Sequence, residues 1–262
     1  MEKSLHTAAT GMRAQQLYID TIANNLANVN TTGFKKSKVE FQDLLYQTER
    51  SAGTTVSQGS SAPTELQIGC GTRPVSTTKM FTQGDVSQTG NSLDLAIEGD
   101  GFFQLRMSDG STAYSRDGSF KISGDGQLVN SDGYYLEPAL TIPQDTQAIQ
   151  ISRDGLVYVL LPGSAEAQEL GQIEIARFLN PGGLKSIGRN LLLETSASGA
   201  PLIGVPDQDG YGGLWQGYLE NSNVEVVEEM VGMITAQRAY EINSKTIKTA
   251  DDMMGLVNNL KR

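Results

Sequence analysis

The sequence predicts an α+β fold in which long helices at both termini form a coiled-coil-like stem and a mostly antiparallel β domain is inserted between them. Three observations predict it. Apolar residues recur every seven positions near each terminus, the intervening region alternates apolar and polar residues, and Asp-Gly pairs interrupt that region. A seven-residue repeat is typical of paired helices, and Asp-Gly favours the positive φ angles of hairpin turns.

Residues 1–34 are predicted to form the first terminal helix and the turn that ends it. Ser4 is the expected N-cap, and the residues from Asn28 to Gly33 are turn formers that end the helix. Taken alone, such a helix is most simply explained as an amphipathic helix packed on its own domain. Its two heptad rows are Leu5, Met12, Ile19 and Leu26, then Ala8, Gln15, Ile22 and Val29.

Residues 35–95 and 196–221 are predicted to be an extended, partly β connecting domain. It includes an arm at about 46–66, because residues 47–63 are rich in Ser, Thr and Gly and hold almost no large apolar side chain. Two interpretations of this arm remain open, a disordered linker or a segment ordered by a neighbouring subunit. Residues 96–195 carry most of the Asp-Gly pairs and the alternating segments, and they are predicted to form an outer β domain.

Residues 222–262 are predicted to form the second terminal helix, about 38 residues and therefore about 57 Å long at 1.5 Å per residue. Glu228 and Glu229 lie in its first turns, where the helix dipole favours negative charge. A β domain of this size needs no such helix for its own core. The helix carries one heptad row of Val226, Met233, Tyr240, Ile247 and Met254, and beside it a row of Ala236, Asn243, Ala250 and Val257.

The two terminal helices are expected to pair antiparallel or side by side, so that the chain enters and leaves through one stem. Gln15 and Asn243 lie in the seams, where polar side chains lower stability but specify register. Alanine-lined seams are marginal alone, so neighbouring subunits are expected to complete the burial; a simple coiled-coil dimer is the alternative. The predicted assembly seam consists of Leu5, Met12, Ile19, Ile22, Leu26, Val29, Val226, Met233, Tyr240, Ile247, Met254 and Val257.

Composition excludes several classes of partner. The chain has 262 residues with 20 basic and 30 acidic side chains, a net charge of -10, and no basic cluster that would meet phosphates. No apolar run reaches the roughly 20 residues needed to cross a bilayer. The N-terminus lacks the apolar region of a secretory signal, so the protein is expected to stay in the cytoplasm or to leave without a cleaved signal. Cys70 is the only cysteine and forms no intramolecular disulfide.

No group of residues has the pattern of an active site, and we expect neither an enzyme, a cofactor nor a metal. His6 is the only histidine, and Cys70 has no nearby candidate base. The Asp-Gly loops lack calcium-site spacing. Tyr134, Tyr135 and Trp215 are more simply explained by strand packing than by sugar stacking. Two alternatives stay open, a secreted β-domain binding module dimerised by its helical ends and a hydrolase within the β domain.

Motifs at both ends resemble the signatures of the bacterial flagellar rod and hook protein family. The N-terminal motif runs through residues 4–12 and 22–35, and the closing motif through 220–224 and 233–245. Residues 66–75 and 99–103 narrow the resemblance to the distal rod members, over essentially the whole chain. Cys70 departs from the family pattern and receives no role. The signature residues are Asn24, Asn25, Asn28, Asn30, Thr32, Gly33, Phe34, Gln237, Arg238, Tyr240 and Asn243.

The resemblance implies a structural subunit of the flagellar distal rod. Such subunits would polymerise into a rigid helical tube that transmits torque from motor to hook and encloses the export channel. Expected partners are other copies, other rod proteins, the hook protein and P- and L-ring-type bushing proteins. The expected location is the periplasmic rod of the basal body, reached through the flagellar type III system without a cleaved signal peptide. A proximal rod or hook protein is the alternative within the family. Asn24, Asn25 and the residues from Asn28 to Thr32 would join the inner tube to the outer layers.

Overall fold

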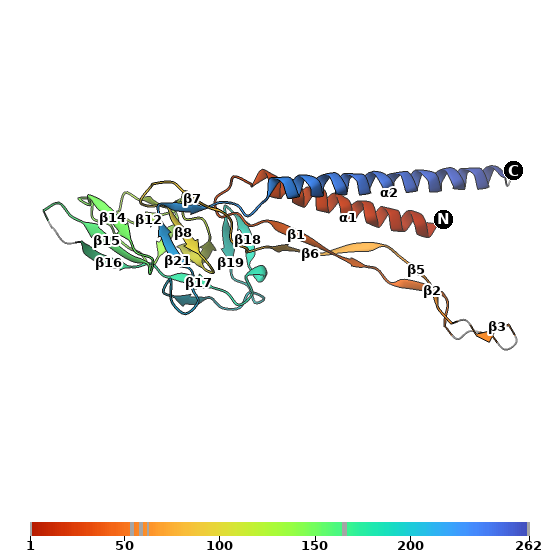
Figure 1. The fold of residues 1–262 in the computed structure, drawn as a ribbon, viewed down its shortest axis with the longest axis horizontal. Coiled ribbons are helices and arrows are strands. Elements are labelled where there is room, and N and C mark those ends of the chain that lie inside the picture. Colours follow the sequence, from red (N-terminus) through yellow and green to blue (C-terminus); the bar gives the residue numbers. More distant parts are fainter. Residues whose placement is uncertain (1, 53–54, 58–59, 62, 164–166, 261–262) are drawn as a thin grey trace. The chain divides into compact units, whose positions relative to one another are not determined.

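The computed structural model describes residues 2–52, 55–57, 60–61, 63–163 and 167–260 (Figure 1). The predicted α+β class is confirmed, with a long helix at each end and antiparallel strands between them. The chain divides into two compact units and passes between them four times. Unit 1 consists of Met1–Leu26, Ser37–Thr78 and Val226–Arg262, and unit 2 of Ala27–Lys36 and Lys79–Glu225. The division into stem, connecting domain and outer domain stays a prediction.

Unit 1 contains the two α-helices of the described chain. Helix α1 is Glu2–Ala27, and helix α2 is Val226–Leu260 with 35 residues, close to the predicted length. Ser4 lies inside α1 and is therefore not its N-cap; that prediction is wrong because the helix begins before it. The stop after Ala27 falls where the turn-forming residues predict it. Neither helix is long and apolar enough, over its described residues, to cross a membrane.

A two-stranded β ribbon completes unit 1. Strands β1 (Ser37–Asp43) and β6 (Thr72–Lys79) pair, then β2 (Tyr46–Arg50) with β5 (Leu66–Gly69), and β3 (Thr55–Ser57) with β4 (Ser60–Ser61). The arm, predicted to be a disordered linker or a segment ordered by a neighbouring subunit, is a hairpin in its described residues, since ladder hydrogen bonds form without a core. Residues 53, 54, 58, 59 and 62 of the arm lie outside the described residues.

Helix α1 lies along this ribbon. The rings of Tyr18 and Phe41 meet edge to face with centroids 6.3 Å apart. The backbone N–H of Thr72 donates to Thr10 Oγ1 over 3.3 Å, and Lys3 Nζ lies 2.6 Å from Glu49 Oε1. Contacts therefore run from the first turn of α1 to its fifth and hold the ribbon to one side of the helix.

Unit 2 is built on one large antiparallel sheet. Its order is β11-β12-β13-β9-β10-β19-β18, with β17 pairing both β9 and β20. The strands of this sheet are β9 (Phe102–Arg106), β10 (Thr112–Ser115), β11 (Lys121–Ile122), β12 (Leu128–Val129), β13 (Tyr135–Glu137), β17 (Ile175–Arg177), β18 (Lys185–Gly188), β19 (Leu191–Leu193) and β20 (Leu202–Gly204).

Smaller sheets surround the large one. Strands β14 (Ala148–Ile151), β15 (Leu156–Leu160) and β16 (Gln168–Gln172) form a three-stranded sheet. Strand β8 (Leu95–Glu98) pairs with β21 (Gly213–Gln216), and β7 (Val86–Gln88) pairs with β22 (Tyr218–Glu220). A short 3-10 helix spans Pro181–Gly183. Glycines with positive φ turn four of the hairpins at predicted Asp-Gly pairs, namely Gly110, Gly126, Gly133 and Gly155.

Strand β9 organises the core of unit 2. Successive side chains of a strand point to opposite faces, so Phe103 and Leu105 enter one apolar cluster and Phe102 enters another. Phe103 packs edge to face on Phe120, and Phe102 on Phe178. Both clusters are closed by side chains from several strands, so unit 2 has a core of its own.

Candidate assembly site

Helices α1 and α2 pack antiparallel within unit 1. A Cβ added to Gly11 would lie 3.0 Å from Asn243 Nδ2, and one added to Gly232 would lie 3.3 Å from Ile22 Cδ1. Residues further along α1 therefore meet residues earlier in α2. Ala236 and Ala250, one heptad on either side of Asn243, are buried. Small side chains thus carry the contact between the two helices.

The residues of the predicted assembly seam lie beside this contact and differ in exposure. Ile22 is buried between the helices, whereas Val226 and Tyr240 are exposed. Val29 follows the end of α1 and lies in unit 2. The side chain of Val257 lies outside the described residues. The partly buried members of the seam are Leu5, Met12, Ile19, Leu26, Met233, Ile247 and Met254. Their role between subunits stays a prediction.

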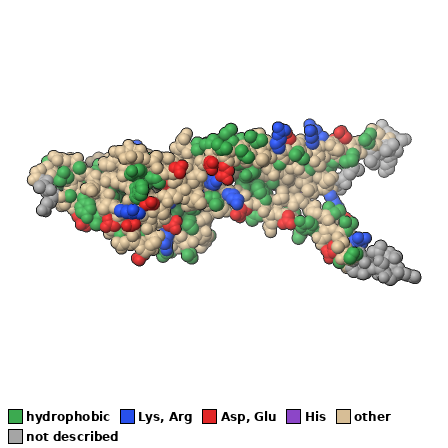
Figure 2. Space-filling model, in the orientation of Figure 1, with side chains coloured by type: hydrophobic (Ala, Val, Ile, Leu, Met, Phe, Trp, Pro, Cys, Tyr) green, Lys and Arg blue, Asp and Glu red, His purple; other side chains and the backbone are tan. Residues whose placement is uncertain are grey.

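A second apolar strip on α2 was missed by the heptad reading. The strip consists of Val227, Met230, Val231 and Ile234, which are exposed on the face of α2 away from Asn243. Figure 2 shows apolar side chains gathered over the start of α2, with basic ones further along. The signal was present as the doublets 226–227 and 230–231, which place apolar residues on more than one face. The exposed fractions are 68% for Val227, 51% for Met230, 56% for Val231 and 54% for Ile234.

The ribbon of unit 1 also presents apolar side chains to solvent. Leu45, between β1 and β2, is 87% exposed. Tyr46 and Leu66 are exposed on the paired strands β2 and β5. A lone hairpin gains little stability from side chains that remain in water. The exposed large apolar residues of the ribbon are Phe41, Leu45, Tyr46, Leu66, Ile68 and Val75.

Within the N-terminal signature, Asn25 ties three elements of unit 1 together. Its Nδ2 donates to the carbonyl of Ser37 over 3.0 Å, and its Oδ1 accepts from the N–H of Ser37 over 2.9 Å. The same Nδ2 also donates to Glu229 Oε2 over 3.3 Å. The buried amide therefore fixes the end of α1 to the start of β1 and to the first turn of α2. Asn24 is exposed.

The rest of that signature forms a loop within unit 2. Gly33 has φ +67, and a Cβ there would lie 2.7 Å from Arg116 C, so only glycine fits. Asn190 Nδ2 donates to the carbonyl of Thr32 over 3.1 Å. The ring of Phe34 lies 5.2 Å from Lys79 Nζ. Asn28 Oδ1 accepts from the hydroxyl of Thr31, and Asn30 is exposed.

A buried charge cluster anchors this loop. Glu220 Oε1 accepts from Lys35 Nζ over 2.6 Å and from the N–H of Gly84 over 2.9 Å, and its Oε2 faces Arg116 Nε at 3.3 Å. The side chains of Lys35 and Glu220 are only 2% and 1% exposed. Burial lowers the pKa of Lys35 and that of Arg116. Removing one member of such a cluster leaves uncompensated charge in the interior.

Asn223 joins the segments next to the cluster. Its Oδ1 accepts from the N–H of Lys36 over 2.7 Å. Its Nδ2 donates to the carbonyls of Met80 and Thr82 over 2.8 and 3.1 Å. Three segments distant in sequence are therefore held side by side by one amide. Sequence reasoning placed Asn223 in the closing motif at residues 220–224 and missed Lys35, Arg116 and Glu220 as a cluster.

The closing signature lies on α2. Asn243 faces Gly11 of α1, while Gln237 and Arg238 are exposed. Arg238 Nη1 lies 3.8 Å from Glu241 Oε2, an exposed pair one turn apart that contributes little. Tyr240 is exposed as well. Gln237, Arg238 and Tyr240 are therefore available to other molecules.

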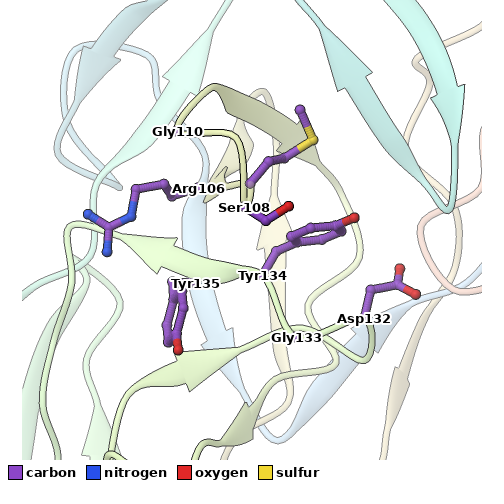
Figure 3. A pocket seen from close by; sticks show the side chains of 8 residues that line it. Arg106, Ser108, Gly110, Asp132, Gly133, Tyr134 and Tyr135 are labelled. Atoms are coloured by element: carbon purple, nitrogen blue, oxygen red, sulfur yellow. The ribbon is translucent and has the colours of Figure 1, made fainter.

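One pocket in unit 2 has a volume of about 530 Å³ and lies between two hairpin turns (Figure 3). Arg106 lies over the ring of Tyr135 at 5.9 Å, and Arg189 Nη1 donates to the hydroxyl of Tyr134 over 3.3 Å.

In the described part of the chain, no three His, Cys, Asp or Glu side chains are grouped so that they could hold a metal. His6 is exposed and Cys70 is half-buried.

Comparison with protein families matches three separate stretches of the chain. Residues 5–35 match the model described as flagella basal body rod protein. Residues 96–159 match the flagellar hook protein FlgE/F/G D1 domain. Residues 216–260 match the flagellar basal body rod FlgEFG protein C-terminal model. The matches cover both signatures and the centre of the large sheet.

Individual relatives are similar over the full length. The flagellar basal-body rod protein FlgG of Borreliella burgdorferi is 53% identical, over 100% of both chains. FlgG of Agrobacterium fabrum is 50% identical over 99% of this chain and 100% of the relative. FlgG of Caulobacter vibrioides is 49% identical over 99% of both. The chain therefore belongs to the FlgG family of flagellar basal-body rod proteins.

Proposed function

We propose that this structural subunit of the flagellar distal rod polymerises through unit 1 into a rigid helical tube. The terminal helices line the tube around an export channel, and torque passes along it from motor to hook. Partners are further copies, other rod and hook proteins, and surrounding ring proteins that act as bushings. The chain reaches the basal body through the flagellar type III system without a cleaved signal peptide.

The observation that carries this proposal is the exposed apolar strip of α2. Val227, Val231 and Ile234 lie on a helix face that no described part of unit 1 covers. Burying apolar surface of this kind stabilises a contact by about 25 cal/mol per Å² of area removed from water. Every copy carries this strip and the exposed apolar residues of the ribbon. Each subunit therefore has more than one surface that can contact its neighbours.

The rigidity of the proposed tube is supported by a firmly held loop in unit 2. The loop at residues 28–34 is held by Gly33, by Asn190 and by the Lys35–Glu220–Arg116 cluster. Such a loop resists bending because every movement would break buried polar contacts. A shaft that transmits torque needs subunits that do not deform where the chain leaves the helices.

Substitution of Val231 by aspartate tests the proposal. A carboxylate in the strip must lose its water when the face is covered, so the critical concentration for polymerisation should rise at least tenfold, roughly the effect of burying an unpaired polar group. The purified full-length chain is polymerised, pelleted by ultracentrifugation and viewed by electron microscopy. Circular dichroism of the monomer checks that the helices persist.

The matched control is Thr249→Asp, which places the same charge at an exposed polar position of the same helix. Its critical concentration should stay within a factor of two of the natural protein, an estimate based on the small effect of exposed charges. If Val231→Asp polymerises as readily as Thr249→Asp, the strip is not a subunit interface and the proposal fails.

A further inference from the structure

A second hollow in unit 2, with a volume of about 290 Å³, combines an aromatic ring with two carboxylates. Trp215 lies in β21 directly opposite Ala96 of β8, and its ring meets Tyr218 edge to face at 5.3 Å. Asp85 and Glu98 line the same hollow. Its size suits one long side chain, because pockets for whole small molecules usually begin at about 300 Å³.

The polar groups of the hollow have binding capacity left. Among the described residues the carboxylate of Asp85 has no hydrogen-bond or ion-pair partner, and the indole N–H of Trp215 donates to none. Glu98 uses Oε2 for Arg153 at 2.8 Å and leaves Oε1 available. Gln83 uses its amide within the chain, because its Nε2 donates to the carbonyl of Ile97 and its Oε1 accepts from the N–H of Gly99.

A cation on an apolar stem fits these groups. Trp is the strongest aromatic partner for a cation over its ring face, and a carboxylate alongside adds a charge-assisted hydrogen bond. We propose that this hollow, which we call the Trp215 socket, receives a lysine or arginine side chain from a second copy of the chain. The proposal rests on the polymerisation proposed above and names one of its lateral contacts.

The distribution of charge favours a second copy as the source. Unit 2 has ten basic and nineteen acidic residues, a net charge of -9, whereas unit 1 has ten and eleven, a net charge of -1. Copies of unit 2 brought together in a polymer therefore repel one another. Each socket that takes a cation from unit 1 of another copy removes part of that repulsion.

Unit 1 also has cations to offer. In unit 2, Arg153, Arg177 and Arg189 are each held by hydrogen bonds to neighbours. Lys245 and Lys248 are exposed on α2, and their ammonium groups have no partner among the residues that the structure describes; the same holds for Lys121 and Lys185 of unit 2. The cation can therefore come from a lysine of another copy, and a lysine of α2 comes from the unit with the smaller net negative charge.

The fluorescence of the protein reports directly on the socket, because Trp215 is the only tryptophan of the chain. Acrylamide quenching of its fluorescence is measured on the full-length monomer and on polymers identified by electron microscopy. The quenching constant should fall at least threefold on polymerisation, an order-of-magnitude expectation for a ring that becomes covered. An unchanged constant in well-formed polymers overturns the socket while the rod-subunit function stands; if no polymer forms, the assembly proposal fails and the socket with it.

Asp85→Asn tests whether the occupant is basic. It should raise the critical concentration about fivefold and weaken the dependence on salt, as expected for a partly buried cross-subunit charge pair. Asp145→Asn is the matched control, since Asp145 is also exposed in unit 2 and has no partner among the described residues. If Trp215 becomes covered but the two variants polymerise alike, a neutral surface covers it and the proposed cation is wrong.

Discussion

Unit 2 buries most of its large apolar side chains, whereas unit 1 leaves many of its own in water. Phe103, Phe120 and Leu105 are fully buried in unit 2. The buried side chains along the helices of unit 1 are mostly alanines, and larger ones such as Val227 and Ile234 are exposed. Unit 2 therefore has an apolar core of its own, and unit 1 has exposed apolar surface that the proposed contacts between copies would bury.

The two units also differ in net charge. Unit 1 has a net charge of -1, and unit 2 carries -9 of the total net charge of -10. A near-neutral surface with apolar side chains favours association, while an acidic one keeps subunits soluble and apart. In the proposed assembly, this contrast favours cohesion between copies through unit 1 and requires specific contacts where copies of unit 2 approach one another.

The largest expected effect on stability is that of Glu220→Gln in unit 2. The substitution leaves Lys35 and Arg116 buried without their anion, so the free energy of unfolding should fall by about 3–5 kcal/mol. Urea unfolding followed by Trp215 fluorescence measures it, because Trp215 lies in unit 2. Glu98→Gln is the control, since its pair with Arg153 is exposed and should contribute less than about 1 kcal/mol. Equal losses for both variants would show that burial of the cluster does not matter.

Hydrogen exchange tests the contrast between the units directly. In the monomer, amides of α2 should exchange at least about 100-fold faster than those of β9 and β10, because helices without a buried core open locally. After polymerisation the α2 amides should become protected and the β9 amides should not change. If α2 is as protected as β9 in the monomer, unit 1 is stable by itself and the contrast disappears.

A smaller effect is expected at two glycines of unit 2 that share a positive φ. Gly110→Ala should lower the free energy of unfolding by about 1 kcal/mol, through the left-handed backbone alone, since nothing lies within 4 Å of the added Cβ. Gly33→Ala should lower it by about 2 kcal/mol more, because its Cβ would overlap backbone atoms of Arg116 and Asp117. Thermal unfolding measures both. Equal shifts would mean that the loop at Gly33 can move away, and that it is not rigid.

Much of the fold follows from local sequence patterns. The heptad rows predict both helices, and the stop after Ala27 is marked by the turn formers that follow it. Asp-Gly pairs predict hairpins that the structure confirms at Gly110 and Gly155. These features depend on neighbours within a few residues, which is why one sequence suffices to find them.

The candidate site was less accessible to the same reasoning. Lys35, Arg116 and Glu220 are far apart in sequence and meet only because strand pairing brings them together. The outer strip of α2 was missed because the seam was sought in the two adjacent heptad rows that begin with Val226 and Ala236. For the arm, a disordered linker and a segment ordered by a neighbouring subunit both stayed open, because residues 47–63 cannot form a core; two strands can nevertheless pair without one.

The four passages of the chain between the units have a mechanical consequence. They fall at residues 26–27, 36–37, 78–79 and 225–226, so any load between the units is shared by four covalent connections in parallel. A single polypeptide connection would carry the whole force and twist freely about its bonds. Four cannot all rotate independently, and cleavage of one leaves three. The covalent path of the chain thus makes a joint that tolerates damage.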